Sequence, residues 1–395
     1  MRETGLELAV RGGGHSLAGH STTDKGIVLD LTDMNALEID PEQRTAWAQT
    51  GLTAGAYTTA AGAYGLATGF GDTGSVGIGG ITLGGGVGFL VRKYGLTVDS
   101  LLAADVVTAD GQLLRADAES HPDLFWAIRG GGGNFGVVTG FQFRMQDVET
   151  IFGGMLFLPA TPEVIAAFVA EAEAAPDELS TIANVMPAPP LPFLPAEHHG
   201  TLVIMALMAY AGPVDEGERV LAPFRALATP IADMLRAMPY PEIYPPEDES
   251  HHPVATARTL FVDTIDRGVA QTIVEHLESS TAPLRVAQLR VLGGAMARVP
   301  ADATAFAHRS GRIMVNVAAV YGGPDEAAVH APWVTGFAAA LRQSHTGAYV
   351  GFIADEGEQR VHDAYPDSTW HRLAEIKRRY DPTNLFRLNQ NIPPA

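Results

Sequence analysis

The spacing of apolar and polar positions predicts short, mixed elements over residues 1–146. An Ala-rich run at 53–64 predicts a helix that ends at Gly65, and Asp110-Gly111 between two apolar runs predicts a hairpin with a type I′ turn. Two further apolar runs predict short buried strands. The expected elements are buried strands 6–10 and 27–31, helix 53–64, hairpin strands 102–108 and 112–115, helix 122–128 and strand 136–143. This part should form one α+β unit.

Longer blocks follow, in which apolar runs of strand length alternate with helical runs. The expected strands are 151–158, 201–210, 284–292 and 312–320, and the expected helices are 162–175, 214–227, 267–279 and 324–342. A proline-rich loop is expected at 239–253. The tail should carry a strand at 349–354 and an amphipathic helix around Trp370. Strands and long helices mixed in this way predict an antiparallel sheet backed by helices.

Composition removes several classes of protein. The chain has 395 residues, with 45 acidic and 26 basic side chains and a formal net charge of −19. Such an acidic chain disfavours binding to nucleic acid or to an anionic membrane, because Lys and Arg dominate both kinds of contact. The longest apolar run, 202–211, is too short to span a bilayer. We expect a cytoplasmic protein, either a monomer or a homodimer.

Metal and thiol chemistry is not expected. The chain has no cysteine, which excludes disulfides, thiolate metal sites and thiol nucleophiles. Two groups of candidate ligands, His198-His199 and the set 248, 249, 251 and 252 (Asp, Glu, His, His), lie in polar, proline-rich loops. They lack the regular spacing of a metal site, so we predict no metal.

Two glycine clusters carry the candidate chemistry. They are Arg11-Gly12-Gly13-Gly14-His15-Ser16 and the segment from Gly77 to Gly88. Glycine reaches positive φ and has no side chain, so successive backbone N–H groups can converge on an anion. One cluster alone is typical of an ordinary tight turn, but two in one unit predict a cradle for a long diphosphate cofactor. His15 could act as a nucleophile on that cofactor, which indicates a flavoenzyme.

The familiar nucleotide motifs do not fit this chain. Residues 131–136 match G-x-G-x-x-G, but a strand is expected after them, so the dinucleotide fingerprint lacks its helix. No G-K-[ST] occurs, which excludes a P-loop. Loops should therefore hold any phosphates. Residues 14–18 nearly match the G-x-S-x-G nucleophile elbow, which leaves a hydrolase as an alternative, although no partner acid or base can be assigned.

Three blocks of the sequence, 10–16, 76–96 and 380–391, resemble the berberine bridge enzyme-like flavoproteins. These form a branch of the vanillyl-alcohol oxidase/p-cresol methylhydroxylase superfamily. The resemblance implies a two-domain α+β fold with an FAD-binding domain at 1–146, an inserted substrate-binding domain at 147–346 and a C-terminal segment at 347–395 that returns to the FAD domain. Relatives have a further strand-helix-strand before the first cluster, so we expect one side of the FAD domain to expose apolar surface.

The resemblance also implies a covalent FAD, attached through the imidazole of His15 to a methyl carbon of the isoalloxazine. Many relatives have a second tether from a cysteine, and Thr73 stands at that position here, so one bond is expected. The first cluster and 77–80 should contact the pyrophosphate, 136–138 the adenine, and the tail asparagines the flavin edge, unless they only cap a turn. The cofactor-binding residues expected are Arg11, Gly12, Gly13, Gly14, His15, Ser16, Thr73, Gly77, Gly79, Gly80, Gly136, Val137, Val138, Asn389 and Asn391.

Four residues are candidates for the reaction itself. Tyr94, which follows Arg92-Lys93, resembles a family position that faces the substrate and is a candidate base, because a nearby cation would stabilise a phenolate. Tyr349 is a second candidate. The alternative for Tyr94 is a buried core tyrosine. Gln288 and Arg290 share one face of a strand by their period of two, either toward the substrate or toward solvent. The resemblance is weaker at 351–352, where relatives usually have asparagine and often tyrosine, but this chain has glycine and phenylalanine.

The predicted function is an FAD-dependent oxidase that removes a hydride from an alcohol, a sugar hydroxyl or an activated C–H of a small molecule. Electrons would pass to O2 and give hydrogen peroxide. A dehydrogenase with another acceptor, or a flavin-binding protein with little turnover, are the alternatives that the sequence leaves open.

Overall fold

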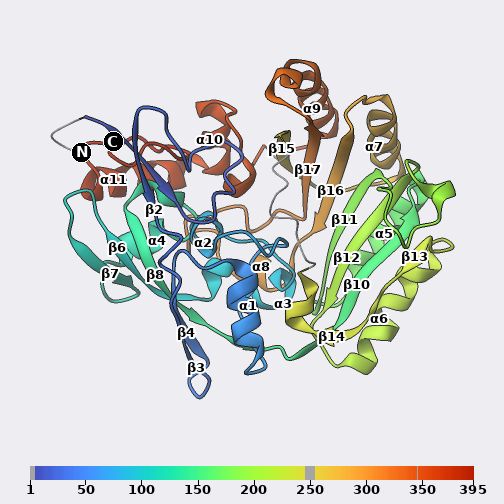
Figure 1. The fold of residues 1–395 in the computed structure, drawn as a ribbon, viewed down its shortest axis with the longest axis horizontal. Helices are drawn as coiled ribbons and strands as arrows, with labels where there is room; N and C mark the ends of the chain where they lie inside the picture. The colour runs from blue at the N-terminus through green and yellow to red at the C-terminus, as the bar shows by residue number, and fades with distance from the viewer. Residues whose placement is uncertain (1–4, 245–253, 345) are drawn as a thin grey trace.

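The computed structural model describes residues 5–244, 254–344 and 346–395. Two sheets lie side by side, each with helices of its own (Figure 1). The first and last parts of the chain build the left half of this view, and the middle part builds the right half. The two ends of the chain both lie on the left, so the middle part is inserted into a unit made from both termini.

The left half is built on a five-stranded antiparallel sheet. Its strands, in spatial order, are β3 (Leu37–Asp40), β4 (Thr45–Gln49), β8 (Val137–Arg144), β6 (Leu101–Val107) and β7 (Leu113–Asp117). Its core gathers aromatic rings from the sheet and from helix α1 (Ala54–Gly62), in which Tyr57 packs edge-on against Phe70 at 4.9 Å and Phe143 at 5.9 Å. Helices α4 (Pro122–Ala127) and α11 (Asp367–Tyr380) share this core, so the end of the chain belongs to the first unit.

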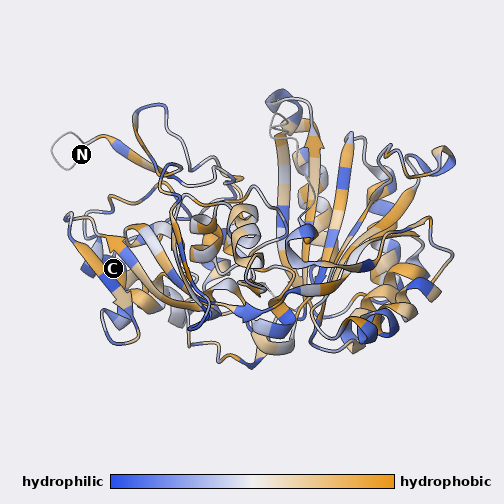
Figure 2. Cartoon of the chain, turned by 60° about the horizontal axis from the view of Figure 1, so that its bottom comes forward, coloured by the Kyte–Doolittle hydropathy of each residue, from blue (hydrophilic) through white to orange (hydrophobic). Residues whose placement is uncertain are grey.

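The right half is an eight-stranded antiparallel sheet covered by helices on one face. Its strands, in spatial order, are β13 (Ala232–Asp233), β10 (Thr150–Pro159), β12 (Leu202–Tyr210), β11 (Leu179–Pro187), β16 (Leu284–Val291), β17 (Ile313–Tyr321) and β15 (Val254–Val262), with β14 (Arg236–Pro239) beside β10. The covering helices are α5 (Pro162–Ala174), α6 (Val214–Ala226), α7 (Arg267–Ser279) and α9 (Ala327–Leu341). Apolar residues of the strands and helices form one core, visible as orange along the strands in Figure 2.

Most predicted elements are confirmed within two or three residues, including the hairpin β6–β7 and helices α1, α4, α5, α6, α7 and α9. Side-chain caps explain two of the helix starts, because Thr161 and Asp266 accept backbone N–H bonds from Val164 and Val269. The predicted strand at 349–354 is wrong. This segment is a 3-10 turn over Val350–Phe352, closed by a hydrogen bond from Phe352 N to Tyr349 O at 2.9 Å.

Strands β1 (Glu7–Arg11) and β2 (Gly26–Asp30) pair in parallel beside the first glycine cluster. Both were predicted to be buried, and for β2 this is wrong. Ile27, Val28 and Leu29 are 45%, 38% and 39% exposed, because β1 is the one strand that pairs with β2 among the described residues.

Buried arginines join the two halves. Arg92, in α3 (Val91–Tyr94), donates to the carbonyls of Ala172 and Ala175 at 2.9 and 2.7 Å, and so binds the C-terminal end of α5. Arg309 forms a two-pronged ion pair with Asp99 at 2.7 and 2.8 Å. Breaking the Arg309–Asp99 pair would leave one buried charge uncompensated. Together with the Arg92 hydrogen bonds, this pair fixes the two halves relative to each other.

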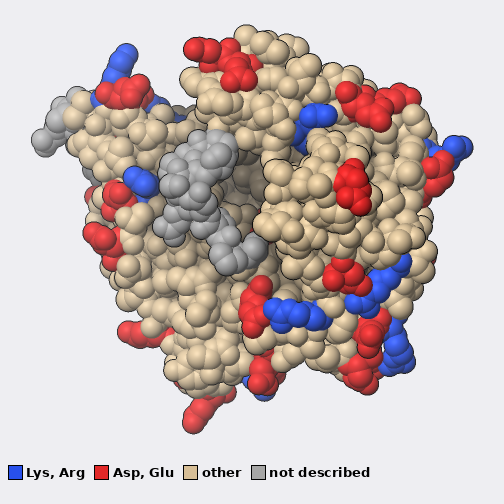
Figure 3. All heavy atoms as spheres, turned by 45° about the vertical axis from the view of Figure 1, so that its right-hand side comes forward, with Lys and Arg blue, Asp and Glu red and all other residues tan. Residues whose placement is uncertain are grey.

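Acidic side chains outnumber basic ones in this chain, 45 to 26. On the face drawn in Figure 3, acidic groups are scattered among fewer basic ones, and a hollow opens between the two halves. Within the described ranges, no helix is both long and apolar enough to cross a membrane.

Candidate functional site

A cavity of about 440 Å³ lies where the two glycine clusters meet the C-terminal segment. Its walls come from Thr50 and from five segments that are far apart in sequence, namely 8–31, 71–87, 132–138, 349–353 and 386–390. The lining includes thirteen of the fifteen residues expected to bind the cofactor, namely Gly12, Gly13, Gly14, His15, Ser16, Thr73, Gly77, Gly79, Gly80, Gly136, Val137, Val138 and Asn389. The other two differ: Arg11 pairs with Asp30 at 3.7 Å, and Asn391 lies just past the lining segment.

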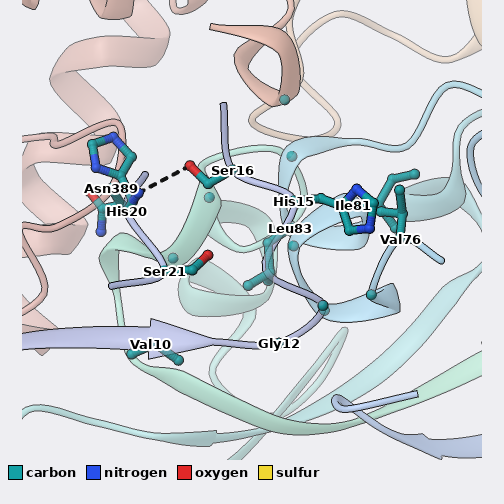
Figure 4. A pocket seen from close by; sticks show the side chains of 18 of the residues that line it. Val10, Gly12, His15, Ser16, His20, Ser21, Val76, Ile81, Leu83 and Asn389 are labelled. Carbon is teal, nitrogen blue, oxygen red and sulfur yellow. Dashed lines mark hydrogen bonds between the residues drawn. The ribbon is translucent and has the colours of Figure 1, made fainter. Parts of the chain in front are cut away.

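His15 stands on the wall of this cavity, on a loop that glycines hold tightly. In Figure 4 its ring lies beside Ile81, a side chain of the second cluster, and Val76, which precedes that cluster. Gly14 has φ +75°, a backbone conformation that side chains disfavour, and Gly13 touches the backbone of Gly77. The imidazole is exposed on its loop, so its ring nitrogens are accessible from the cavity.

His20 lies at another part of the same wall. Its backbone N–H donates to Ser16 Oγ at 3.3 Å, and its ring lies near Asn389 (Figure 4). Burial lowers the pKa of His20, and the negative charge of Asp355 opposes this. The surroundings of His20 therefore favour its neutral form.

The second glycine cluster is more than a phosphate loop. Ile78–Gly84 forms the short helix α2, and a Cβ on Gly79 would lie 2.3 Å from Thr50 Oγ1. By contrast, a Cβ on Gly80 would meet nothing within 4 Å, so this glycine faces open space at the cavity. Some of these glycines therefore allow close packing and others leave the wall open, and the sequence predicted no helix over this segment.

The C-terminal segment reaches the cavity from a buried anchor. Lys377 Nζ donates to Asp381 Oδ2 at 2.6 Å, and both side chains are fully buried. The same ammonium group donates to the carbonyls of Asn134 and Phe386 at 2.8 and 3.0 Å. The chain then runs into the cavity wall at Asn389, whose Oδ1 atom is buried without a hydrogen-bond partner.

Tyr349 also lines the cavity, and its phenol lies against backbone groups of the second glycine cluster. Its oxygen accepts the N–H of Gly86 at 3.1 Å, and the backbone of Val87 also hydrogen-bonds to it. Burial raises the pKa of Tyr349, the Gly86 and Val87 bonds and Arg290 lower it, and Asp72 raises it. Two N–H donors that favour the phenolate make this tyrosine the better placed of the two candidate bases.

Gly351 packs closely against Tyr349. A Cβ on Gly351 would lie 2.8 to 2.9 Å from the ring and hydroxyl of Tyr349, so a larger residue would displace the phenol as it is placed here. Phe352 packs edge-on against the same ring, with centroids 5.1 Å apart. The turn at 350–352 thus holds the phenol against the second glycine cluster.

Gln288 and Arg290 do share one face of β16, as the period of two predicted, and that face turns toward the left half. Arg290 is 3% exposed and binds Gln288 Oε1, Val87 O and Asp72 Oδ2. Gln288 also donates to Asn184 Oδ1 at 2.9 Å. This buried network, and not solvent, surrounds both side chains.

Tyr94 lies outside this arrangement. It packs in an apolar cluster with Phe89 and Ile182, and Lys93 Nζ lies 5.2 Å from its ring centroid. Lys93 also donates to Ala211 O, and Arg92 binds α5, so the two cations of this motif serve contacts between the halves. The structure does not bring Tyr94 to the cavity wall.

Sequence reasoning missed two features of the site. One is Asp72, which ends up between the cavity and Arg290; a carboxylate inside the glycine-flanked stretch 71–77 was the available signal. The other is the amide pair of Gly86 and Val87. No group of three or more His, Asp or Glu in the described ranges could hold a metal, and candidates 248–252 lie outside those ranges.

The residues present fit a flavin dinucleotide. The cavity is lined by glycine backbone and apolar side chains along most of its length, which suits a flat aromatic ring and a diphosphate. Asn389 offers a buried oxygen without a partner, which a ring N–H could satisfy. His15 supplies an accessible ring nitrogen beside the same space.

Comparisons with known proteins agree with this interpretation. Residues 1–117 match the FAD binding domain family, and residues 348–393 match the berberine and berberine-like family. Over 404 residues the chain is 30% identical to an uncharacterised FAD-linked oxidoreductase, YgaK, of Bacillus subtilis (strain 168), covering all of this chain and 87% of that protein. It is 29% identical to (R)-6-hydroxynicotine oxidase of Paenarthrobacter nicotinovorans, over 99% of this chain and 87% of that one.

The fold agrees as well. The crystal structure of 6-hydroxy-D-nicotine oxidase from Arthrobacter nicotinovorans superposes with a TM-score of 0.86 at 26% identity, covering 100% of this chain and 88% of that one. Fold and site together define an FAD-binding oxidoreductase. The chain belongs to the berberine bridge enzyme-like family of FAD-linked oxidoreductases.

Proposed function

We propose that this enzyme is an oxidase that removes a hydride from a hydroxyl-bearing carbon or an activated C–H of a small molecule and passes the electrons to O2. Residues 1–146 and 347–395 would hold FAD, and 147–346 would cover the substrate. The observation that carries the proposal is that His15 and Tyr349 line the same glycine-rich cavity. When bound, FAD supplies the two-electron acceptor for the hydride.

His15 is the proposed attachment residue. Its imidazole is accessible on the cavity wall, and the tight contact between Gly13 and Gly77 keeps its loop in one position. One covalent bond is the limit, because Thr73 has no thiol to offer at the position of the second tether. Asn389, with its unpartnered oxygen, would bind the polar edge of the ring.

Tyr349 is the proposed base. Burial raises the pKa of Tyr349, and the backbone of Gly86 and Val87 and the charge of Arg290 oppose this effect. A phenolate there could accept the substrate hydroxyl proton while the hydride leaves the carbon. The substrate would lie between this phenol and the ring of the cofactor. Gln288 and Arg290 do not line the cavity, because both side chains are held in the buried network, so they would act on the substrate only through Tyr349 and Asp72.

The reaction can be tested before the substrate is identified. The purified yellow protein is mixed without air with a panel of alcohols, sugars and phenols, and bleaching of the flavin absorbance is recorded. Air is then admitted and hydrogen peroxide is measured per turnover. One peroxide per substrate oxidised supports the oxidase. Bleaching with little peroxide would indicate a dehydrogenase, and no bleaching by any compound would favour a flavin-binding protein with little turnover.

A further inference from the structure

Asp72 is the one carboxylate among the described residues that line the cavity. Its Oδ2 atom accepts a hydrogen bond from Arg290 at 2.6 Å, across 218 residues of sequence. The side chain of Arg290 is 3% exposed and that of Asp72 is 19% exposed. The pair is therefore shielded from water on the arginine side, while the carboxylate keeps access to the cavity.

Arg290 does not need the charge of Asp72 to stay in place. Its guanidinium also donates to Gln288 Oε1 at 2.8 and 3.0 Å and to Val87 O at 3.1 Å. An amide in place of the Asp72 carboxylate would still offer an oxygen to Arg290 and would leave these other bonds intact. The charge of Asp72 can therefore be removed without releasing Arg290.

Arg290 and Tyr349 both lie against the ring of Phe352. The Arg290 guanidinium carbon is 5.2 Å from the Phe352 centroid, and the Tyr349 centroid is 5.1 Å from it. The charged groups that act on the phenol are Arg290, from β16, and Asp72, from the segment before α2. Tyr365, which follows α10 (Glu358–Ala364), is a further titratable group that interacts with the Tyr349 phenol.

We propose that Asp72 is a positioning residue of this site, a counter-charge that offsets Arg290 beside the Tyr349 phenol. The inference rests on the proposed function, in which Tyr349 is the base. A guanidinium paired with a carboxylate favours a nearby phenolate less than an unpaired one does, because the two charges act in opposite directions. Asp72 thereby raises the pH above which Tyr349 is ionised, and the ionised phenolate is the form that accepts a proton.

The direction of each effect follows from the charges. Burial is the largest influence and raises the pKa of Tyr349, while Arg290 lowers it and Asp72 raises it. Removing the charge of Asp72 should therefore make Tyr349 ionise at a lower pH, and removing the charge of Arg290 should make it ionise at a higher pH. A merely structural role for Asp72 predicts no such pair of opposite shifts.

The experiment is a titration of the holoenzyme followed by the near-ultraviolet absorbance of tyrosinate. Each variant is compared with the same variant carrying Tyr349→Phe, so that the difference reports Tyr349 alone. We expect the ionisation midpoint of Asp72→Asn to fall by about 1 pH unit or more, and that of Arg290→Gln to rise. Asp72→Glu, which keeps the charge, should stay near the wild-type midpoint.

Asp233→Asn is the matched control. Asp233 forms an ion pair of the same 2.6 Å length with Arg225, at the edge of the eight-stranded sheet, and its loss should leave the midpoint unchanged. An unchanged or raised midpoint in Asp72→Asn would overturn the proposal. If that variant does not fold, a midpoint in Arg290→Gln no higher than wild type overturns it instead. The titration needs no turnover, so failure of the proposed function would appear separately, as a wild-type flavin that no compound bleaches.

Discussion

Gly13 and Gly77, one from each glycine cluster, meet backbone to backbone. A Cβ on Gly13 would lie 2.3 Å from the Gly77 nitrogen, and a Cβ on Gly77 would lie 2.4 Å from the Gly13 nitrogen. Both obstacles are main-chain atoms, so no change of rotamer could relieve the contact. Two clusters some sixty residues apart in sequence thus form one structural unit, and the cavity lies beside it.

Gly77→Ala should therefore damage both the fold and the cavity. We expect the free energy of unfolding to fall by about 1–3 kcal/mol, because the added methyl group must push two backbones apart. The flavin content per chain should fall with it. Denaturant unfolding and the visible absorbance of the purified protein measure the two effects.

Gly336→Ala is the control for that experiment. Gly336 lies inside helix α9, where a Cβ would meet nothing within 4 Å. Alanine there should raise the free energy of unfolding by about 0.5–1 kcal/mol and leave the flavin content unchanged. Equal stability and flavin content in Gly77→Ala and wild type would contradict the close contact of the clusters.

Lys377→Met tests the anchor of the C-terminal segment. The substitution leaves the Asp381 carboxylate buried without its cation, which should lower the free energy of unfolding by about 3–5 kcal/mol. Arg379→Met, two residues further along α11, removes a cation that is 65% exposed and pairs with Asp123. That loss should cost less than about 1 kcal/mol. Similar losses of the free energy of unfolding in the two variants would show that the buried pair stabilises the C-terminal segment no more than the exposed pair does.

Tyr349→Phe and Tyr94→Phe distinguish the two candidate bases. With any substrate that bleaches the flavin, loss of the Tyr349 hydroxyl should slow flavin reduction by about 10²- to 10⁴-fold, because the base is gone while the ring remains. Tyr94→Phe should change the rate little, because Tyr94 packs in a separate apolar cluster. Rapid-mixing absorbance measures both rates. Slow flavin reduction in Tyr94→Phe together with an unchanged rate in Tyr349→Phe would instead identify Tyr94 as the base.

Asp117 should give a measurable acid dependence of stability. The N–H of Ser120, the ion pair with Arg115 and the N–H of Glu119 together lower the pKa of Asp117 to about 2. A lowered pKa in the folded state means that the stabilisation is present above the ordinary aspartate value and is lost as the pH falls from about 4 toward about 2.

The Asp117→Asn variant tests this dependence. At neutral pH it should lose no more than about 1 kcal/mol of the free energy of unfolding, because the ion pair with Arg115 is solvent-exposed. Below about pH 4 the difference from wild type should shrink. Urea unfolding of both proteins over this range makes the comparison, and a constant difference would contradict the assignment.

The sequence was informative where the chemistry is local. A run of glycines ending in His15, and a second run at 77–88, each carry their conformation and their reactive atom within a few residues. Amphipathic helices such as α7 and the Asp110-Gly111 hairpin are local for the same reason. The helices and the hairpin were predicted correctly because neighbours in sequence determine them, and the role of His15 stays a prediction.

Features that depend on distant partners were not predictable. Strand β11 is buried on both faces along nearly its whole length, so it shows no alternation of polar and apolar residues. The pair of Asp72 and Arg290 joins positions 218 residues apart. The turn at 350–352 was predicted as a strand because its apolar residues look strand-like, whereas the Tyr349 ring folds back over Gly351.

The central claim is that His15 carries the cofactor, and mass spectrometry of the denatured protein tests it most directly. Wild type should be heavier than its polypeptide by one FAD, His20→Ala should keep that mass, and His15→Ala should lose it. A wild-type protein with the bare polypeptide mass, or an FAD mass that persists in His15→Ala, would contradict the account.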